Sequence, residues 1–424
     1  RRTFTFSCWL KRANLGSTGG TTGNNIFGGD RTGTFSDRLM FGTADDGNDY
    51  LEASFQDGSS GTCKTSALYR DTPQAVASSR VKIYVNGIEA TLNSPTYPAQ
   101  DYDTYINYTE NQAIAVRPGT LTQQHYGGYL SEIILLDGTA STPTNFGQFD
   151  SNGVWVPIDP TAIITANKGT NGFWLDFADS SDLGNDVSYS GLSVGTDNSF
   201  TSVNMGTANS TLDRPADDVD NEIGNYATLS PLDFFNASAT LSEGNLKAVG
   251  TGTTTAHYNL ATINFSSGKY IYASIPQTAS TAWDGHLNLH NVDFTSATRS
   301  PGTGIPNNTW TIYMATAPAM TLYNGAGGQF QVNTSPTWVL GDYLLHAVDA
   351  DNNKLWFGWY DVSAGNTYWL NYNSGSPTSS TWDADPASGS GAITLDSPPY
   401  APSLAVYSSP RSGVFDAGQG GYIN

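Results

Sequence analysis

The sequence predicts an all-β protein built from two antiparallel β-sandwich domains, which are joined by a linker rich in Ser, Asn and Asp. Three observations support this prediction. Strand-like segments recur about every eight to twelve residues, a spacing typical of sandwiches and barrels. Helical periodicity is nearly absent. The 424 residues also include 45 glycines and 20 prolines, which supply the turns that many short strands need.

Several segments of the first half predict strands through polar–apolar alternation or a short apolar run. The pair Asn86-Gly87 is the strongest short-range hairpin signal, because both residues readily adopt a positive φ. An acidic turn between two strand-like segments predicts a second hairpin. The predicted strands are residues 3–10, 38–41, 50–55, 62–69, 81–85, 88–89 and 129–136.

The composition changes to Ser, Asn, Thr, Asp and Gly near residues 187–225, where Arg214-Pro215 is typical of a crossing between domains. We therefore place a first domain at residues 1–190, a linker at 191–230 and a second domain at 231–424. Further strands are predicted at residues 245–249, 257–263, 269–275, 286–289, 309–314, 344–349, 354–360 and 368–372.

The charge balance excludes some partners. The chain has 18 Lys and Arg against 38 Asp and Glu, a net charge of -20. Nucleic-acid binding depends on cations that neutralise phosphates, so we expect no nucleic-acid partner. The longest apolar runs have four residues, as at 133–136, whereas a membrane-spanning helix needs roughly 20. We therefore expect no membrane insertion.

Two cysteines and five histidines leave little room for a zinc site. We interpret Cys8 and Cys63 as buried thiols, which are common in protein cores. A disulfide between them is the alternative, and it would indicate an oxidising compartment. His286 and His290 lie on a predicted strand, where they share a face but are far apart.

Candidate catalytic residues are few, and we expect no enzymatic activity. A glycosidase needs two carboxyl groups about 5–10 Å apart. Glu132 is the best single candidate, but Asp137, the next acid along the chain, falls on the opposite face of the predicted strand. His125 lies in a predicted loop, and the chain has neither a Gly-x-Ser-x-Gly elbow nor a phosphate-binding loop.

Several segments resemble known families. The first half resembles a laminin-G/concanavalin A-like jelly roll in RTFTFSCWLK (2–11), RVKIYVNG (80–87), GGYLSEIILLDG (127–138) and FWLDFADSSDLGNDVS (173–188). The second half is similar to SPRY domains in GDYLLHAVDADNNKLWF (341–357). Together with TNFG (144–147) and NYATLSP (225–231), their order resembles large structural proteins of tailed marine bacteriophages.

The resemblance also carries an expectation about the completeness of the chain. Laminin-G-like domains place a central strand before the hairpin at 81–89, and residues 69–75 show no such strand. We therefore expect that a stretch of chain near residues 71–73 is missing from this sequence. The chain begins Arg1-Arg2-Thr3 without an initiator methionine, so we also expect residues before it.

Calcium is the one ion that the sequence favours, because two loops are rich in the oxygen ligands that it prefers. Both loops resemble calcium-binding positions of laminin-G-like domains. Turn formation alone also explains their composition, so both interpretations stay open. The candidate ligands are Asp45, Asp46, Asn48 and Asp49 in the first loop, and Asp179, Asp182, Asn185 and Asp186 in the second.

Aromatic residues crowd one stretch of the second domain, and sugar rings stack on flat aromatic faces. Alternation places Leu355, Phe357 and Trp359 on one face of the strand at 354–360, which we expect to be core. The outward aromatics then serve a glycan or a neighbouring subunit. The candidate glycan-binding residues are Trp356, Tyr360, Tyr368, Trp369 and Tyr372.

Together these features favour a non-enzymatic virion structural protein, such as a tail fibre, spike or capsid-surface appendage that contributes to attachment to host-surface glycans. Such a protein is assembled in the host cytoplasm and exposed on the particle surface. Its expected partners are other virion proteins and further copies of itself. The alternatives are a purely architectural virion protein, a polysaccharide depolymerase and a secreted adhesin.

Overall fold

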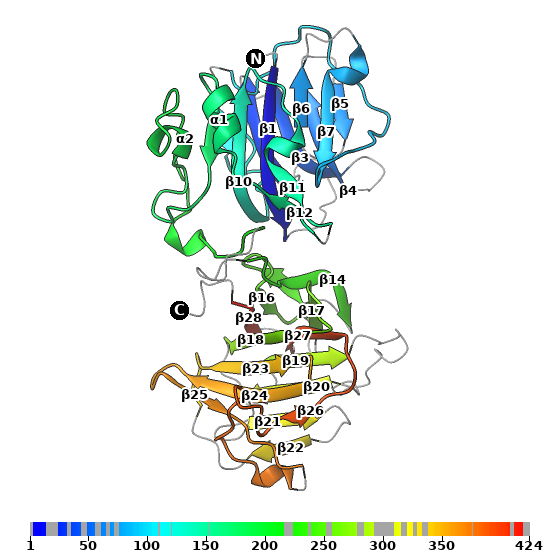
Figure 1. The fold of residues 1–424 in the computed structure, drawn as a ribbon, viewed down its shortest axis with the longest axis vertical. Coiled ribbons are helices and arrows are strands. Elements are labelled where there is room, and N and C mark those ends of the chain that lie inside the picture. Colours follow the sequence, from blue (N-terminus) through cyan, green and yellow to red (C-terminus); the bar gives the residue numbers. More distant parts are fainter. Residues whose placement is uncertain are drawn as a thin grey trace. The chain divides into compact units, whose positions relative to one another are not determined.

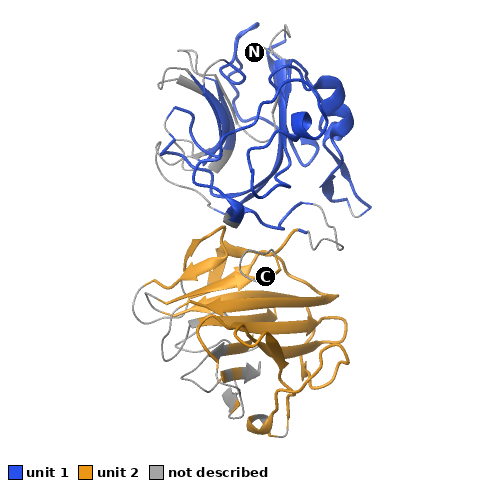
Figure 2. Ribbon diagram, turned by 90° about the vertical axis from the view of Figure 1, so that its left-hand side faces the viewer, with its two compact units in different colours: residues 1–224 blue, residues 225–424 orange. Residues whose placement is uncertain are grey.

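The computed structural model forms two compact units, Arg1–Gly224 and Asn225–Asn424 (Figure 2). Each unit is a β-sandwich, which confirms the predicted all-β class. The structure describes residues 3–13, 24–31, 35–43, 49–55, 61–64, 68–71, 76–108, 111–119, 121–151, 153–215, 224–235, 239–251, 257–277, 284–291, 309–314, 320–324, 329–332, 338–374, 376–407 and 411–418.

Unit 1 packs two antiparallel sheets face to face (Figure 1). Phe6 and Phe27, which come from opposite sheets, stack with ring centroids 4.9 Å apart in the shared core. The first sheet has the order β13 (Phe173–Leu175), β10 (Gly128–Asp137), β1 (Thr3–Arg12), β6 (Leu68–Asp71), β7 (Val81–Val85) and β8 (Ile88–Glu89). The second has the order β5 (Gly61–Lys64), β4 (Asp49–Phe55), β3 (Phe35–Thr43), β2 (Asn24–Arg31) and β9 (Gln112–Ile114).

Both predicted hairpins of unit 1 are confirmed. Strands β3 and β4 pair antiparallel, with Thr43 opposite Asp49. Strands β7 and β8 meet at Asn86 and Gly87, whose φ angles are 47° and 76°. A Cβ atom at Gly87 would lie 2.3 Å from the ring of Trp155, so this turn requires glycine for close packing as well as for backbone conformation.

The central strand that the sequence analysis found missing is present. The predicted strand at 62–69 divides into β5 and β6, which belong to different sheets. Strand β6 pairs with β1 on one side and with β7 on the other, so it fills the central position. This corrects the reason for expecting a missing stretch; residues 72–75 themselves lie outside the described residues.

Short helices, which the sequence analysis did not predict, cover part of unit 1. Ile164 of helix α1 (Thr161–Asn167) packs with Ile134 and Leu136 of β10 in a second apolar cluster. The remaining elements of the unit are helix α2 (Val187–Ser190), the hairpin β11 (Gly147–Phe149) and β12 (Trp155–Pro157), and the 3₁₀ turns Ala77–Ser79, Pro143–Asn145 and Thr207–Asn209.

Unit 2 is a sandwich whose two sheets have more strands than those of unit 1, and it has one main core (Figure 1). One sheet has the order β14 (Leu229–Phe235), β17 (His257–Ala261), β27 (Tyr400–Val406), β19 (Asp284–Asn291), β20 (Thr309–Met314), β21 (Met320–Asn324) and β22 (Gln329–Val332). The other has the order β15 (Thr240–Ser242), β16 (Lys247–Val249), β28 (Ser412–Asp416), β18 (Lys269–Pro276), β23 (Tyr343–Asp349), β24 (Lys354–Asp361) and β25 (Asn366–Trp369). Strand β26 (Ile393–Thr394) pairs with β24, and Pro377–Ser379 forms a 3₁₀ turn.

The segment that the sequence analysis assigned to a linker is largely part of unit 1, which extends to Gly224. Phe200 from this segment packs edge-on against the core residue Phe173, with centroids 4.9 Å apart. Within the described residues, no helix is long and apolar enough to cross a membrane.

Candidate functional site

Unit 1 contains a cleft of about 1770 Å³. Its walls come from the loop at 102–108 with strand β9, from the N-terminal half of β10, from the end of β13, and from residues 197–214. Ligand pockets for drug-sized molecules usually have volumes of roughly 300–1,000 Å³, so this cleft has room for a longer ligand.

Tyrosines are prominent in the cleft lining. Tyr108 is 48% exposed, and its ring meets that of the buried Tyr105 edge-on at 6.2 Å. Tyr102, Tyr126 and Tyr129 also line the cleft. A tyrosine offers both an apolar ring face and a hydroxyl group, and burial raises the pKa of Tyr126 and Tyr129, so these two phenols stay neutral donors.

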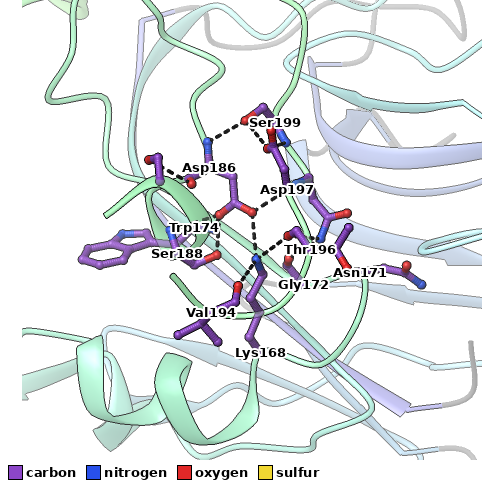
Figure 3. Close-up of polar contacts among 12 residues, drawn as sticks. Lys168, Asn171, Gly172, Trp174, Asp186, Ser188, Val194, Thr196, Asp197 and Ser199 are labelled. Carbon is purple, nitrogen blue, oxygen red and sulfur yellow. Dashed lines mark hydrogen bonds and ion pairs between the residues drawn. The ribbon is translucent and has the colours of Figure 1, made fainter. Parts of the chain in front are cut away.

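Residues 194–214, which we call the strap, include the wall at 197–214, and Lys168 anchors the start of this segment (Figure 3). The ammonium Nζ lies 3.0 Å from Oδ2 of Asp186, 2.8 Å from the carbonyl oxygen of Val194 and 2.7 Å from that of Thr196. The side chains of Lys168 and Asp186 are 1% and 0% exposed. An ammonium has three donors, and all three find acceptors here.

The carboxylate of Asp186 joins three parts of the chain. Oδ1 accepts hydrogen bonds from the backbone N–H of Trp174 at 3.0 Å and of Ser188 at 3.2 Å, and from the Ser188 hydroxyl. Oδ2 also accepts from the backbone N–H of Asn198, at 3.2 Å. Asp186 therefore ties strand β13 and the first turn of α2 to the strap.

A second ion pair holds the other end of the strap. Nζ of Lys11, on β1, lies 2.7 Å and 3.0 Å from the two carboxylate oxygens of Asp213. The same ammonium lies 5.6 Å from the ring centroid of Tyr129, within the range of a cation–π contact. The Asp213 side chain is only 4% exposed, so this pair is screened less than a surface pair.

The structure corrects one calcium ligand. Asp186 was grouped with Asp179, Asp182 and Asn185, but its carboxylate is already filled by N–H and O–H donors and by the Lys168 ammonium. A cation from the chain itself thus occupies the place expected for a metal. This corrects the assignment of Asp186.

The other residues of this loop form a turn. Oδ1 of Asp179 accepts from the backbone N–H of Ser181 at 2.9 Å and from its hydroxyl at 2.6 Å, which lowers the pKa of Asp179. Asp182 is exposed, and its backbone N–H donates to the carbonyl of Asp179. Among the described residues, no group of three or more acidic, His or Cys side chains is arranged to hold a metal ion.

The first calcium loop lies mostly outside the described residues. This applies to Asp45, Asp46 and Asn48. Asp49 is the first residue of β4, and its side chain is not described. The prediction of calcium at this loop therefore stays a prediction.

The five aromatic candidates of unit 2 contribute to packing more than expected. Trp356 is 2% exposed, and its Nε1–H donates to the carbonyl oxygen of Ser390 at 2.6 Å. Leu355, Phe357 and Trp359 lie in the core as predicted. Both faces of β24 are thus covered, which corrects the interpretation of Trp356 as an outward stacking surface.

The other four aromatics are half-buried. Tyr368 stacks on Trp359 at 4.9 Å, and Tyr372 packs against the same core. A Cβ atom at Gly358 would lie 2.5 Å from the ring of Trp369, so this ring rests on the backbone of β24. Tyr360 tilts against Tyr343 at 5.6 Å. None of these five residues lines the cleft of unit 1.

Glu132 has a structural role. It has a φ of 50° at a β-bulge, where β1 and β10 shift register between Ser7 and Trp9. Its Oε2 accepts a hydrogen bond from Nε1–H of Trp174 at 2.7 Å. Burial raises the pKa of Glu132, and the Trp174 bond partly offsets this. Glu132 is not among the described residues that line the cleft.

The structure also places Cys8 and His125, two further residues that the sequence analysis considered. Cys8 carries a free thiol whose pKa burial raises to about 12, so it is a poor nucleophile. The side chain of Cys63 is outside the described part of the structure. His125 is exposed at the cleft and makes a 3.3 Å contact from Nε2 to the carbonyl of Leu121.

Sequence reasoning missed both the cleft and Lys168. The residues that line the cleft come from distant segments and share no motif. The Asp186-x-Ser188 pattern before α2 is a helix N-cap signal, and it could have indicated that this carboxylate is used internally.

Comparison with solved structures finds SPRY domains. The SPRY domain of human HERC1 aligns over 45% of this chain and 97% of its own length, with a TM-score of 0.31 and 14% identity. The PSpry domain of TRIM65 aligns over 45% and 91%, with a TM-score of 0.30 and 11% identity. No protein-family profile matches the chain, and no curated protein matches its sequence. The structural likenesses concern the fold alone.

Proposed function

We propose that this chain is a non-enzymatic β-sandwich protein that binds glycans through the cleft of unit 1. The observation that carries the proposal is the cleft itself, about 1770 Å³ in volume and lined by five tyrosines among amides and carboxylates. Aromatic faces with a few polar groups are typical of small-molecule sites. The proposal moves the glycan site from the aromatics of unit 2 to unit 1.

The architecture of the site supports binding more than catalysis. The strap is held near both ends, by Lys168, which pairs with Asp186 and donates to two strap carbonyls, and by the ion pair of Lys11 with Asp213. Preorganised walls lower the entropic cost of holding a ligand. Glu132, the best catalytic candidate, is engaged by Trp174 outside the cleft lining.

We further propose that the protein is part of a virion surface, as a tail fibre, spike or appendage that attaches to host glycans. This rests on the resemblance of the ordered segments to structural proteins of tailed marine bacteriophages, with a laminin-G-like first half and a SPRY-like second half. The net charge of -20 supports this, because like-charged particles resist aggregation. Other virion proteins and further copies of this chain are the proposed partners.

A glycan array probed with the full chain, with and without millimolar calcium, tests the binding proposal. Binding should weaken roughly tenfold in Tyr108→Ala, because the exposed ring is lost. Tyr189→Ala is the matched control: Tyr189 is 45% exposed in the same unit but does not line the cleft. A blank array would support a purely architectural protein, and depolymerised glycan would support the enzyme alternative.

A further inference from the structure

One turn of the cleft wall is held in a strained conformation. Asn107 has a φ of 62°, in the left-handed region that few residues other than glycine adopt. Its backbone N–H donates to Oε1 of Gln112, on β9, at 3.1 Å. Nε2 of Gln112 donates to the carbonyl oxygen of Tyr105 at 3.0 Å, so one side chain clamps both sides of the turn. Strained backbone persists only where surrounding contacts enforce it, and it is common at ligand-binding sites.

Further contacts fix the same turn. The backbone N–H of Tyr105 donates to Oδ2 of Asp37, on β3, at 2.7 Å. A Cβ atom at Gly29, on β2, would lie 2.0 Å from the carbonyl oxygen of Tyr105, so the missing side chain lets the turn lie against this strand. The position of Asn107 is therefore set by its backbone and its neighbours, and its side chain is not needed to hold the turn.

The side chain of Asn107 carries an unused hydrogen-bond donor. Asn107 lines the cleft and is 8% exposed. Within the described part of the chain, its Nδ2 is buried without a hydrogen-bond partner. Buried polar groups are nearly always hydrogen-bonded, because an unpaired donor costs free energy. The χ2 torsion of asparagine is broad, so the carboxamide can turn Nδ2 toward a ligand, and no bond of Nδ2 is broken when it does.

We propose that Asn107 donates this hydrogen bond to the carbonyl oxygen of an N-acetyl group, so that the cleft prefers oligosaccharides built from 2-acetamido sugars. This inference rests on the proposed glycan-binding function and narrows it to a ligand class. A carbonyl oxygen acts only as an acceptor, so it satisfies a lone donor. A sugar hydroxyl also brings a hydrogen that needs an acceptor of its own.

The surroundings of Asn107 suit the rest of such a sugar. Ala113 and Ile114, which follow Gln112 on β9, also line the cleft and offer apolar surface to the acetyl methyl group. Tyr108, the next residue after Asn107, offers its exposed ring to the sugar face. Donor, apolar surface and aromatic ring thus lie along one stretch of the cleft wall.

The test uses the full chain and a pair of ligands that differ in one group. An array of oligosaccharides with and without 2-acetamido groups first identifies the strongest binder, which we expect to carry this group. Its Kd is then compared with that of the analogue in which each acetamido group is replaced by a hydroxyl group. We expect the analogue to bind roughly tenfold more weakly, as is typical when one hydrogen bond to a buried donor is lost.

Variants connect this preference to Asn107. Asn107→Asp replaces the donor with an acceptor of the same shape, and Asn107→Gly removes the side chain and adopts a positive φ without strain. Both should bind the acetamido ligand roughly tenfold more weakly, and the hydroxyl analogue less than about twofold more weakly. Asn86→Asp is the matched control, because Asn86 has a φ of 47° in the same unit but does not line the cleft. It should leave both Kd values unchanged.

The outcomes separate this inference from the proposed function. A strongest binder without acetamido groups, equal Kd values for the ligand pair, or an unchanged preference in both Asn107 variants would overturn the acetamido preference alone. An array without any bound glycan would overturn the binding function and this inference together.

Discussion

The ammonium of Lys168 lies 3.0 Å from Oδ2 of Asp186, and both side chains are almost completely excluded from solvent. Removing two charges from water is costly, and the cost is offset only when the remaining donors and acceptors are satisfied. Here the two strap carbonyls accept the remaining hydrogen bonds of the ammonium. Backbone N–H groups and a hydroxyl group donate to the carboxylate oxygens. The pair therefore acts as an internal cation site that holds one wall of the cleft.

Replacing the buried cation should destabilise unit 1 strongly. Lys168→Met leaves the Asp186 charge buried without its partner, so we expect a loss of about 3–5 kcal/mol in the free energy of unfolding. Hydrogen exchange of unit 1 peptides across a urea series measures it. The double variant Lys168→Met/Asp186→Asn should recover part of the loss, because the uncompensated charge is gone.

The matched control is an exposed pair of the same unit. Lys82 Nζ lies 3.0 Å from Glu89 Oε2, but the two side chains are 33% and 51% exposed. Solvent screens such a pair, so Lys82→Met should cost less than about 1 kcal/mol. Equal losses in the free energy of unfolding for Lys168→Met and Lys82→Met would show that burial does not make the Lys168 pair more important for stability.

The far end of the strap should open when its ion pair is removed. Lys11→Met removes the ion-pair partner of Asp213, whose side chain is only 4% exposed, and should raise cleavage near the exposed Val203 and Met205 roughly fivefold, which corresponds to about 1 kcal/mol of local opening. Limited proteolysis with thermolysin, followed by mass mapping, measures the rate. The midpoint of global unfolding should change little. An unchanged cleavage rate would show that other contacts hold the strap.

The sequence was sufficient to predict strands where side chains alternate. Strands β23 and β24, and the hairpin at Asn86 and Gly87, follow directly from local pattern and turn chemistry. Strand β2 was missed because Gly28-Gly29 in its centre is typical of a turn. Tertiary structure explains these glycines, since a Cβ atom at Gly29 would lie 2.0 Å from the carbonyl oxygen of Tyr105.

The residues of the candidate site were harder to predict, because their roles also depend on contacts between distant segments. Periodicity predicts which face a residue occupies, but it does not show which segments cover that face. Trp356 was assigned to the outer face of β24, and the chain near Ser390 then covers it. The role of Lys168 depends on acceptors from α2's N-cap and from the strap, which no local pattern brings together.

The carboxyl group of Glu132 should make stability depend on pH. Burial raises its pKa, so the folded state binds its proton more tightly than the unfolded state does. Stability from this group is therefore greatest at low pH and falls as pH rises above the ordinary glutamate pKa. Glu132→Gln keeps an acceptor for Trp174 and should gain stability relative to the native chain between pH 4 and pH 7. Urea titrations of both chains across this pH range measure the difference, and an equal difference at every pH would contradict the role of the Glu132 carboxyl group.

Two buried histidines of unit 2 should make the free energy of unfolding rise with pH, which is opposite to the effect of Glu132. Burial lowers the pKa of His286 and of His346 to about 3, with smaller contributions from Arg411 and His290. Below the unfolded pKa of about 6.5, the unfolded state binds protons that the folded state excludes, so stability falls as the solution becomes more acidic.

Each of these histidines contributes up to about 1.4 kcal/mol per pH unit, and the window from pH 6.5 to 5 lies above the titration of ordinary carboxyl groups. His346→Gln retains a polar partner for the hydroxyl of Tyr272, which lies 3.0 Å from Nδ1, and should remove about half of this slope. Urea unfolding followed by tryptophan fluorescence reports mainly on unit 2, which holds most of the tryptophans. The same slope in His346→Gln and in the native chain would show that His346 protonates in the folded state.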